Sequence, residues 1–277
     1  MNLMSTAKIT PNKNYKNMKY YHEKTLTHAS FEEAIQKVTD ALKEEGFGIL
    51  TEIDVKETLK KKLDEDFRPY KILGACNPPF AHKALLAEDK IGAMLPCNVI
   101  VQQVDEGIEV AAVDPVASMQ AVENEGLSKI AEENYKESME TSYCISKRFG
   151  SMTFQEAIDY SKKAFENNGF EIVMHFDLQD HIKKNLDEDI RRYTLLGMCN
   201  AELAIDALSV ENKVGIMLPC NIIIQETGED GVLEIAVTDP LAVLEIADNE
   251  KLQVIGKRAK EQLQKALNEV ERQNIKL

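Results

Sequence analysis

Long apolar runs are missing from this chain of 277 residues. No stretch reaches the roughly 18 consecutive apolar residues that a membrane-spanning helix needs, so the sequence predicts no such helix. The first 19 residues are polar and rich in lysine and asparagine, without the apolar centre of a secretory signal peptide. We therefore expect a soluble, cytoplasmic protein.

Positive charge is also scarce. The chain has 33 lysine and arginine residues against 47 aspartate and glutamate residues, a formal net charge of −14. Because binding to phosphate groups needs a basic face, we expect no nucleic-acid partner and no anionic membrane surface as a partner. An acidic surface mainly keeps a protein soluble.

The sequence contains two copies of one unit. The segment Phe-Glu-Glu-Ala-Ile that begins at Phe31 recurs 123 residues later as Phe-Gln-Glu-Ala-Ile, beginning at Phe154. With the same offset, residues 20–102 and 143–225 align without a gap and share 36 identities in 83 positions. Such internal similarity predicts a tandem duplication of one domain.

The two copies diverge in length beyond Gln102. The second copy gains two residues there, so that Asp114-Pro115 corresponds to Asp239-Pro240. Asp as a cap and Pro at the first helical position predict the start of a helix at both places. The predicted organisation is a polar tail over residues 1–18, a first repeat domain over 19–140 and a second over 141–277.

The same order of elements is expected in each copy. Ser30 and Thr153 are each followed three residues later by glutamate, the capping box that begins a helix. Apolar residues that alternate with polar ones then predict strands. For the first copy we expect strands at 20–27, 47–55, 69–76, 91–103 and 108–113, a charged helix or excursion at 56–66 and a short helix at 79–87. Short connections favour a mainly antiparallel sheet with helices packed on one face, an α+β fold.

The five cysteines are expected to be reduced thiols, because their number is odd and the chain shows no export signal. Four of them occur in two repeated motifs, Leu-Gly-x-Cys-Asn and Met-Leu-Pro-Cys-Asn. Asparagine can both donate and accept hydrogen bonds, and a thiol can act as a ligand or nucleophile. The candidate ligand or thiol site consists of Cys76, Asn77, Cys97, Asn98 and their counterparts Cys199, Asn200, Cys220 and Asn221.

Strand periodicity offers a second interpretation of these thiols. Cys97 falls in an alternating apolar row that would share one strand face, and a cysteine in such a row packs as a small hydrophobic residue. Pro96 and Pro219 cannot donate a hydrogen bond to a sheet, so they predict an edge strand or a bulge. The row in the first copy runs Ile91, Ala93, Leu95, Cys97, Val99, Val101.

A simple hairpin would also keep the two thiols of one copy apart. If the third and fourth strands pair around the short helix, Cys76 lies opposite Ile91. Cys97 is then six residues further on, roughly 20 Å away at about 3.3 Å per residue. Only a bulged or skewed register would bring the two sulfur atoms together.

Recognisable catalytic signatures are absent. The sequence has no CxxC, HExxH, GxSxG, P-loop or GxGxxG motif. Its five histidines (His22, His28, His82, His175 and His181) do not coincide when the copies are aligned. A histidine-based site present in both copies is therefore excluded, we predict no metal site, and the cofactor is left open.

The motifs in their fixed order resemble a known family, the domain of unknown function 302. The resemblance rests on the run from Tyr70 through Cys-Asn-Pro, Met-Leu-Pro-Cys-Asn-Val-Ile-Val and Val-Asp-Pro, and it covers most of each copy. The second copy departs from it at Ala201, where the family pattern has proline. The resemblance implies a β-α-β(4)-α domain that commonly pairs as a homodimer, so the tandem chain would form an internal pseudo-dimer. It implies no established activity.

Three functions remain open at this level. The preferred one is a module that binds or senses a small molecule in the groove between the copies, near the Cys-Asn motifs. The second is a thiol-dependent enzyme or a sulfur or redox carrier that uses Cys97 and Cys220. The third is a non-catalytic scaffold that acts by self-association, and further association of the chain with itself is left open.

Overall fold

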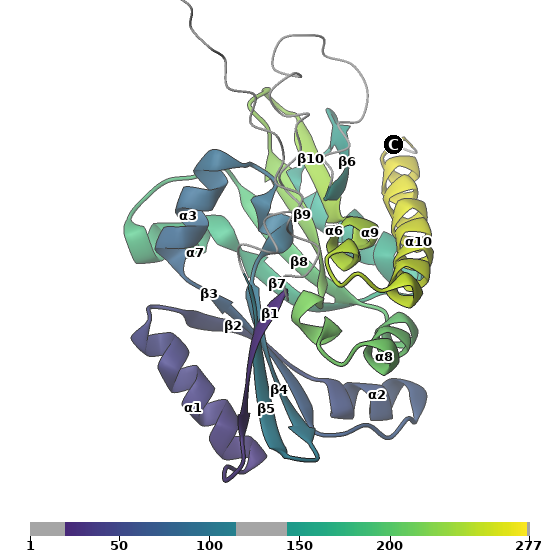
Figure 1. Cartoon of the computed structure of the whole chain (residues 1–277). Coiled ribbons are helices and arrows are strands. Elements are labelled where there is room, and N and C mark those ends of the chain that lie inside the picture. Colours follow the sequence, from purple (N-terminus) through teal and green to yellow (C-terminus); the bar gives the residue numbers. More distant parts are fainter. Residues whose placement is uncertain (1–19, 115–142, 276–277) are drawn as a thin grey trace, which may run out of the picture.

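The computed structural model describes residues 20–114 and 143–275. It contains two five-stranded antiparallel sheets, one from each copy, flanked by helices (Figure 1). The predicted polar tail and the helix predicted to begin at Asp114-Pro115 fall outside the described residues. The matching helix of the second copy is present and begins at Pro240, with Asp239 as its cap.

The first copy follows the predicted order. Its elements are β1 (Tyr21–Leu26), α1 (Phe31–Glu44), β2 (Gly48–Asp54), α2 (Val55–Leu63), β3 (Tyr70–Cys76), α3 (Pro78–Ala87), the 3-10 turn η2 (Ile91–Met94), β4 (Cys97–Val104) and β5 (Gly107–Val113).

The second copy repeats that order, and two helices follow at positions whose counterparts in the first copy lie outside the described residues. Its elements are β6 (Cys144–Phe149), α6 (Phe154–Asn167), β7 (Glu171–Asp177), α7 (Leu178–Leu186), β8 (Tyr193–Cys199), α8 (Ala201–Val210), the 3-10 turn η3 (Val214–Met217), β9 (Cys220–Glu226), β10 (Leu233–Thr238), α9 (Pro240–Glu245) and α10 (Glu250–Ile275).

Local sequence explains where the helices begin and end. The Ser30 and Thr153 side chains accept hydrogen bonds from the backbone N–H three residues on, and both predicted capping boxes are present. Gly46 and Gly169 follow α1 and α6 with φ of 79° and 84°, the left-handed conformation that glycine adopts without strain. The capping chemistry is therefore the same in both copies.

Strand order is β1-β5-β4-β3-β2 in the first sheet and β6-β10-β9-β8-β7 in the second. β4 and β9 are thus central strands. The prediction that Pro96 and Pro219 mark an edge strand or a bulge is wrong, because both prolines lie just before these central strands, where no ladder hydrogen bond is needed.

The predicted strand at 91–103 is also too long. Residues 91–94 form η2, and β4 begins only at Cys97. The alternation of apolar residues arises because Ile91 and Ala93 are buried in a cluster shared with the second copy, whereas Val99 and Val101 pack toward α1. Residues buried in two different hydrophobic clusters therefore gave the alternating pattern of a single strand.

Each sheet has one face covered by helices of its own copy. Ala34 of α1 packs with Leu73, Val99 and Val101 in the first copy. In the second copy α6 and α10 cover the corresponding face and bury a cluster that includes Phe165.

The opposite faces of the two sheets are buried against each other's copy. One cluster joins Ile72 and Ile100 of the first copy to Leu203 and Ile216 of the second. Another joins residues such as Leu85 to the second copy's Ile182. Helix α2 packs beside α8 and α3 beside α7 (Figure 1), so the chain forms the internal pseudo-dimer that was expected.

Buried ion pairs also cross between the copies. Lys213, just before η3, reaches Glu109 of β5 with an Nζ–Oε1 distance of 2.7 Å. Its counterpart Lys90, before η2, lies 3.4 Å from Glu234 of β10. Both lysines are buried, and a buried charge is tolerated only when it is paired.

Candidate functional site

The four Cys-Asn pairs lie at one end of each sheet. Cys76 ends β3, Cys97 begins β4, and Ala75 is directly opposite Cys97 in the register. The predicted separation of roughly 20 Å between the two thiols, at about 3.3 Å per residue, is therefore wrong. The residues 77–96 loop out as α3 and η2 instead of continuing the ladder, so β3 and β4 meet at the two cysteines.

Asn77 and Asn200 have a structural role in their own copy. Asn77 caps α3 and accepts from the N–H of Phe80, while its amide donates to Glu45 O at 3.3 Å. Asn200 caps α8 in the same way and donates to Gly169 O at 2.9 Å. The Cys-Asn step after β3 or β8 is thus a helix start that is hydrogen-bonded to the C-terminal end of α1 or α6.

Asn98 and Asn221 have a different role, because each binds the other copy. The amide of Asn98 donates to Ile216 O and Leu218 O at 3.0 and 2.9 Å. The amide of Asn221 donates to Ala93 O and Leu95 O at 3.0 and 2.6 Å. Each copy therefore supplies a donor, the asparagine of this motif, and two acceptors, the backbone carbonyls of the motif's leucine and of the residue just before the motif.

Tyrosine and glycine complete this reciprocal contact. The Tyr70 hydroxyl donates to Asn212 O at 2.8 Å, and the Tyr193 hydroxyl donates to Asp89 O at 3.0 Å. Gly215 and Gly92 leave the space that these two rings occupy, since an added Cβ would lie 2.2 and 2.4 Å from the hydroxyl oxygens.

The repeated thiols are partly or fully buried. Cys76 is buried, and Cys97, Cys199 and Cys220 are half-buried. Burial raises the pKa of Cys76 and of Cys199 to about 12 and that of Cys220 to about 11, and it also raises the pKa of Cys97. These thiols are therefore protonated at neutral pH, which is unfavourable for a nucleophile.

We expect the repeated thiols to react slowly in the folded protein. A pKa near 11 to 12 instead of about 9 lowers the thiolate fraction at pH 8 by about 100-fold or more. Labelling with a chromogenic disulfide reagent, followed with and without urea, measures the difference, and mass spectrometry assigns the modified residues. Fast labelling of Cys97 or Cys220 in the native protein would contradict this expectation and would support a thiol-dependent enzyme or carrier.

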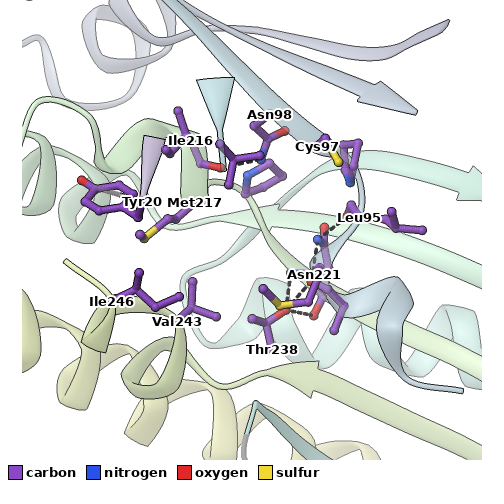
Figure 2. A pocket seen from close by; sticks show the side chains of 15 residues that line it. Tyr20, Leu95, Cys97, Asn98, Ile216, Met217, Asn221, Thr238, Val243 and Ile246 are labelled. Atoms are coloured by element: carbon purple, nitrogen blue, oxygen red, sulfur yellow. Dashed lines mark hydrogen bonds between the residues drawn. The ribbon is translucent and has the colours of Figure 1, made fainter. Parts of the chain in front are cut away.

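A cavity opens between the two Met-Leu-Pro-Cys-Asn segments (Figure 2). The space between its walls is about 700 Å³ when the solvent at the open mouth is counted, and about 70 Å³ of it can hold the centre of a water-sized molecule. Fifteen residues from both copies line it, and none of them is charged. They are Tyr20, Ala93, Met94, Leu95, Pro96, Cys97, Asn98, Val113, Ile216, Met217, Pro219, Asn221, Thr238, Val243 and Ile246.

The polar atoms of this inter-copy cavity are few. The side-chain oxygens of Asn98 and Asn221 are buried, and no donor among the described residues reaches them. The Thr238 hydroxyl contacts Ala93 O at 3.1 Å. The cavity thus has an apolar wall, and the unpaired side-chain oxygens of the two asparagines are buried within the residues that form it.

The predicted site residues are therefore only partly brought together. Cys97, Asn98 and Asn221 line the inter-copy cavity. Cys199 and Cys220 line a neighbouring cavity inside the second copy, as does Asn200. Cys76 and Asn77 line neither.

Prediction from sequence missed the cross-copy function of Asn98 and Asn221. A signal was present, because Asn98 shares a strand face with Ile100, and a buried asparagine there requires a hydrogen-bond partner.

In the described ranges 20–114 and 143–275, no group of three or more potential ligand side chains is arranged to hold a metal. Within the same ranges, no helix is both long and apolar enough to cross a membrane.

Comparison with known proteins gives a family and a related structure. The family model described as "Domain of unknown function DUF302" matches residues 22–141 and again residues 145–270. A crystal structure of an uncharacterized conserved DUF302 protein from Bacillus stearothermophilus is similar over 46% of this chain and 98% of its own, with 19% identity and a TM-score of 0.43. No curated protein matches the chain. The chain therefore belongs to the DUF302 family and carries its domain twice in tandem.

Proposed function

We propose that the protein binds a small, uncharged and largely apolar molecule in the inter-copy cavity. The observation that carries this proposal is the cavity itself, to which both copies contribute residues of the same five-residue motif. Ligand pockets are typically concave and mostly apolar, with a few polar groups that fix orientation.

The lining indicates the chemistry of the ligand. An ionised group would lose its hydration there without meeting an opposite charge, which is costly. A neutral N–H or O–H donor would instead satisfy Asn98 Oδ1 or Asn221 Oδ1, for which no donor is found among the described residues, once a small shift of the lining exposes these buried oxygens. Met94 and Met217 give the wall adaptable thioether side chains.

The two alternatives receive less support from the site. A thiol-dependent enzyme needs an accessible thiolate, whereas burial keeps the pKa of these thiols high. A scaffold that uses the motifs for association would need their polar groups free. The side-chain amides of Asn98 and Asn221 instead donate hydrogen bonds to backbone carbonyl groups of the same chain.

The test compares three six-carbon probes of similar shape: hexanamide, hexanoate and hexylammonium. We expect hexanamide to bind at least about tenfold more tightly than either ion, because the cavity desolvates the head group without pairing a charge. Ligand-observed NMR at neutral pH measures the three affinities, and native mass spectrometry of the purified chain shows any molecule that is already bound.

A pair of variants locates the binding site. Ala93→Ile narrows the inter-copy cavity with a side chain that the second copy already carries at the matching position, Ile216. Ala84→Leu adds a similar volume on α3, away from the lining, and serves as the control. Equal hexanamide binding by the folded Ala93→Ile variant and the wild type, or a preference for hexanoate, would rule out the proposed function.

A further inference from the structure

A second cavity lies inside the second copy, beneath α8, α9 and α10. The space between its walls is about 610 Å³ when open solvent is counted, and about 60 Å³ of it can hold the centre of a water-sized molecule. It is lined almost entirely by apolar side chains, and no charged residue is among the described residues that line it. Phe170 and Met198 contribute to its wall from the sheet side, and Ala207, Leu244 and Ala259 contribute from the helices. The Cys199 and Cys220 thiols on its wall are uncharged at neutral pH.

This second cavity adjoins the inter-copy cavity. Three residues line both of them: Met217, Thr238 and Val243. Met217 is half-buried at the end of η3, and Figure 2 shows its side chain on the wall of the inter-copy cavity. Because an unbranched thioether changes rotamer easily, Met217 is the most adaptable part of this partition.

We infer that the two cavities accept one elongated ligand, with its polar end between the copies and an apolar chain that extends past Met217 into the second copy. This inference rests on the proposed function and adds the class of ligand: an uncharged head group on a slender hydrocarbon tail, such as a long-chain primary amide or alcohol.

Two observations favour a chain over a compact ligand. The polar acceptors, Asn98 and Asn221, line only the inter-copy cavity, so the head group has a defined place. The second cavity offers only Thr238, Asn200 and two protonated thiols as polar contacts, and Asn200 is already engaged as a helix cap. An apolar wall of this kind stabilises methylene groups and little else.

A homologous series of n-alkanamides from four to ten carbons tests the inference on the full chain. Burial of each methylene group tightens binding by about fourfold, so the dissociation constant should keep falling as the tail enters the second cavity. In Ala207→Leu, a leucine occupies part of that cavity. The short amides should then bind as they do to the wild type, while the gain with length should stop about three carbons earlier.

The control is Ala84→Leu, which makes the same change at the matching position of α3. If Ala207→Leu does not fold, Ala259→Leu narrows the same cavity from α10, and thermal unfolding checks both proteins. If the short amides bind to the wild type but longer ones gain nothing, or gain equally in the filled variant, the inference is wrong and the inter-copy site stands. If no member of the series binds to the wild type, the proposed function fails and the inference fails with it.

Discussion

Replacement of Asn98 by alanine is expected to lower the free energy of unfolding by about 3–5 kcal/mol, because a buried and a partly buried carbonyl group lose their donor at about 1–3 kcal/mol each and a small cavity is left. The amide of Asn98 donates to Ile216 O and Leu218 O of the other copy, and its side chain is only 6% exposed. Urea unfolding followed by circular dichroism measures the change.

The counterpart Asn221→Ala should cost about 1 kcal/mol less, the typical net value of one hydrogen bond. The Thr238 hydroxyl also contacts Ala93 O, so that carbonyl keeps a donor when Asn221 is removed. In the first copy, the position of Thr238 is taken by Val113, which has no hydroxyl group.

The second asparagine of each motif supplies the matched control. Asn77→Ala removes a helix cap within one copy and should cost about 1 kcal/mol. If Asn98→Ala were no more destabilising than Asn77→Ala, the cross-copy hydrogen bonds would contribute little, and the pseudo-dimer would depend on apolar packing alone.

Gly215→Ala is expected to destabilise the fold by about 3 kcal/mol, near the upper end of overpacking effects in well-packed cores. The added Cβ would lie 2.2 Å from the Tyr70 hydroxyl oxygen and 2.8 Å from two ring carbons, so the ring must move. That movement also weakens the hydrogen bond from Tyr70 to Asn212 O. Thermal and urea unfolding report the loss.

Two further variants make this prediction specific. Gly48→Ala places a Cβ where no atom lies within 4 Å, so its effect should be small. Tyr70→Phe removes the closest atom of the clash but leaves the ring carbons. The double variant Tyr70→Phe/Gly215→Ala should therefore be less destabilised than the sum of the single changes. Additive effects would show that Gly215 and Tyr70 do not contact each other in solution.

Features that depend on neighbouring residues were predictable from sequence. The capping boxes at Ser30 and Thr153, the glycine stops at Gly46 and Gly169, and the duplication itself all rest on patterns a few residues long or on direct self-similarity. Each of these was confirmed because local backbone chemistry decides it.

Features that depend on the other copy were not predictable in this way. The alternation around Ile91 and Ala93 is typical of a strand, but these residues are buried by the second copy and form η2. The mistaken strand then placed Cys97 far from Cys76. The spacing of apolar residues shows which residues are buried, but it does not show which part of the chain covers them. Residues buried by the second copy were therefore predicted to be part of a strand of the first copy.

The asparagines show the same limit at the candidate site. Cys-Asn occurs twice in each copy, yet one asparagine caps a helix and the other donates to the partner half of the chain. The dipeptide alone does not distinguish these functions. In the first copy the proline after Asn77 indicates a helix start, but in the second copy Asn200 caps α8 without a proline after it.

The tandem arrangement also breaks the twofold equivalence of the inter-copy cavity. In a homodimer of identical domains, the two halves of such a cavity would be identical. An asymmetric ligand would then have two equally favourable orientations in it. Here Ala93 faces a cavity whose matching wall carries Ile216, and Val113 is matched by Thr238. The two poses consequently differ in energy. The fused chain therefore has a cavity with two unlike ends, in which a ligand of the kind proposed above would have a preferred orientation.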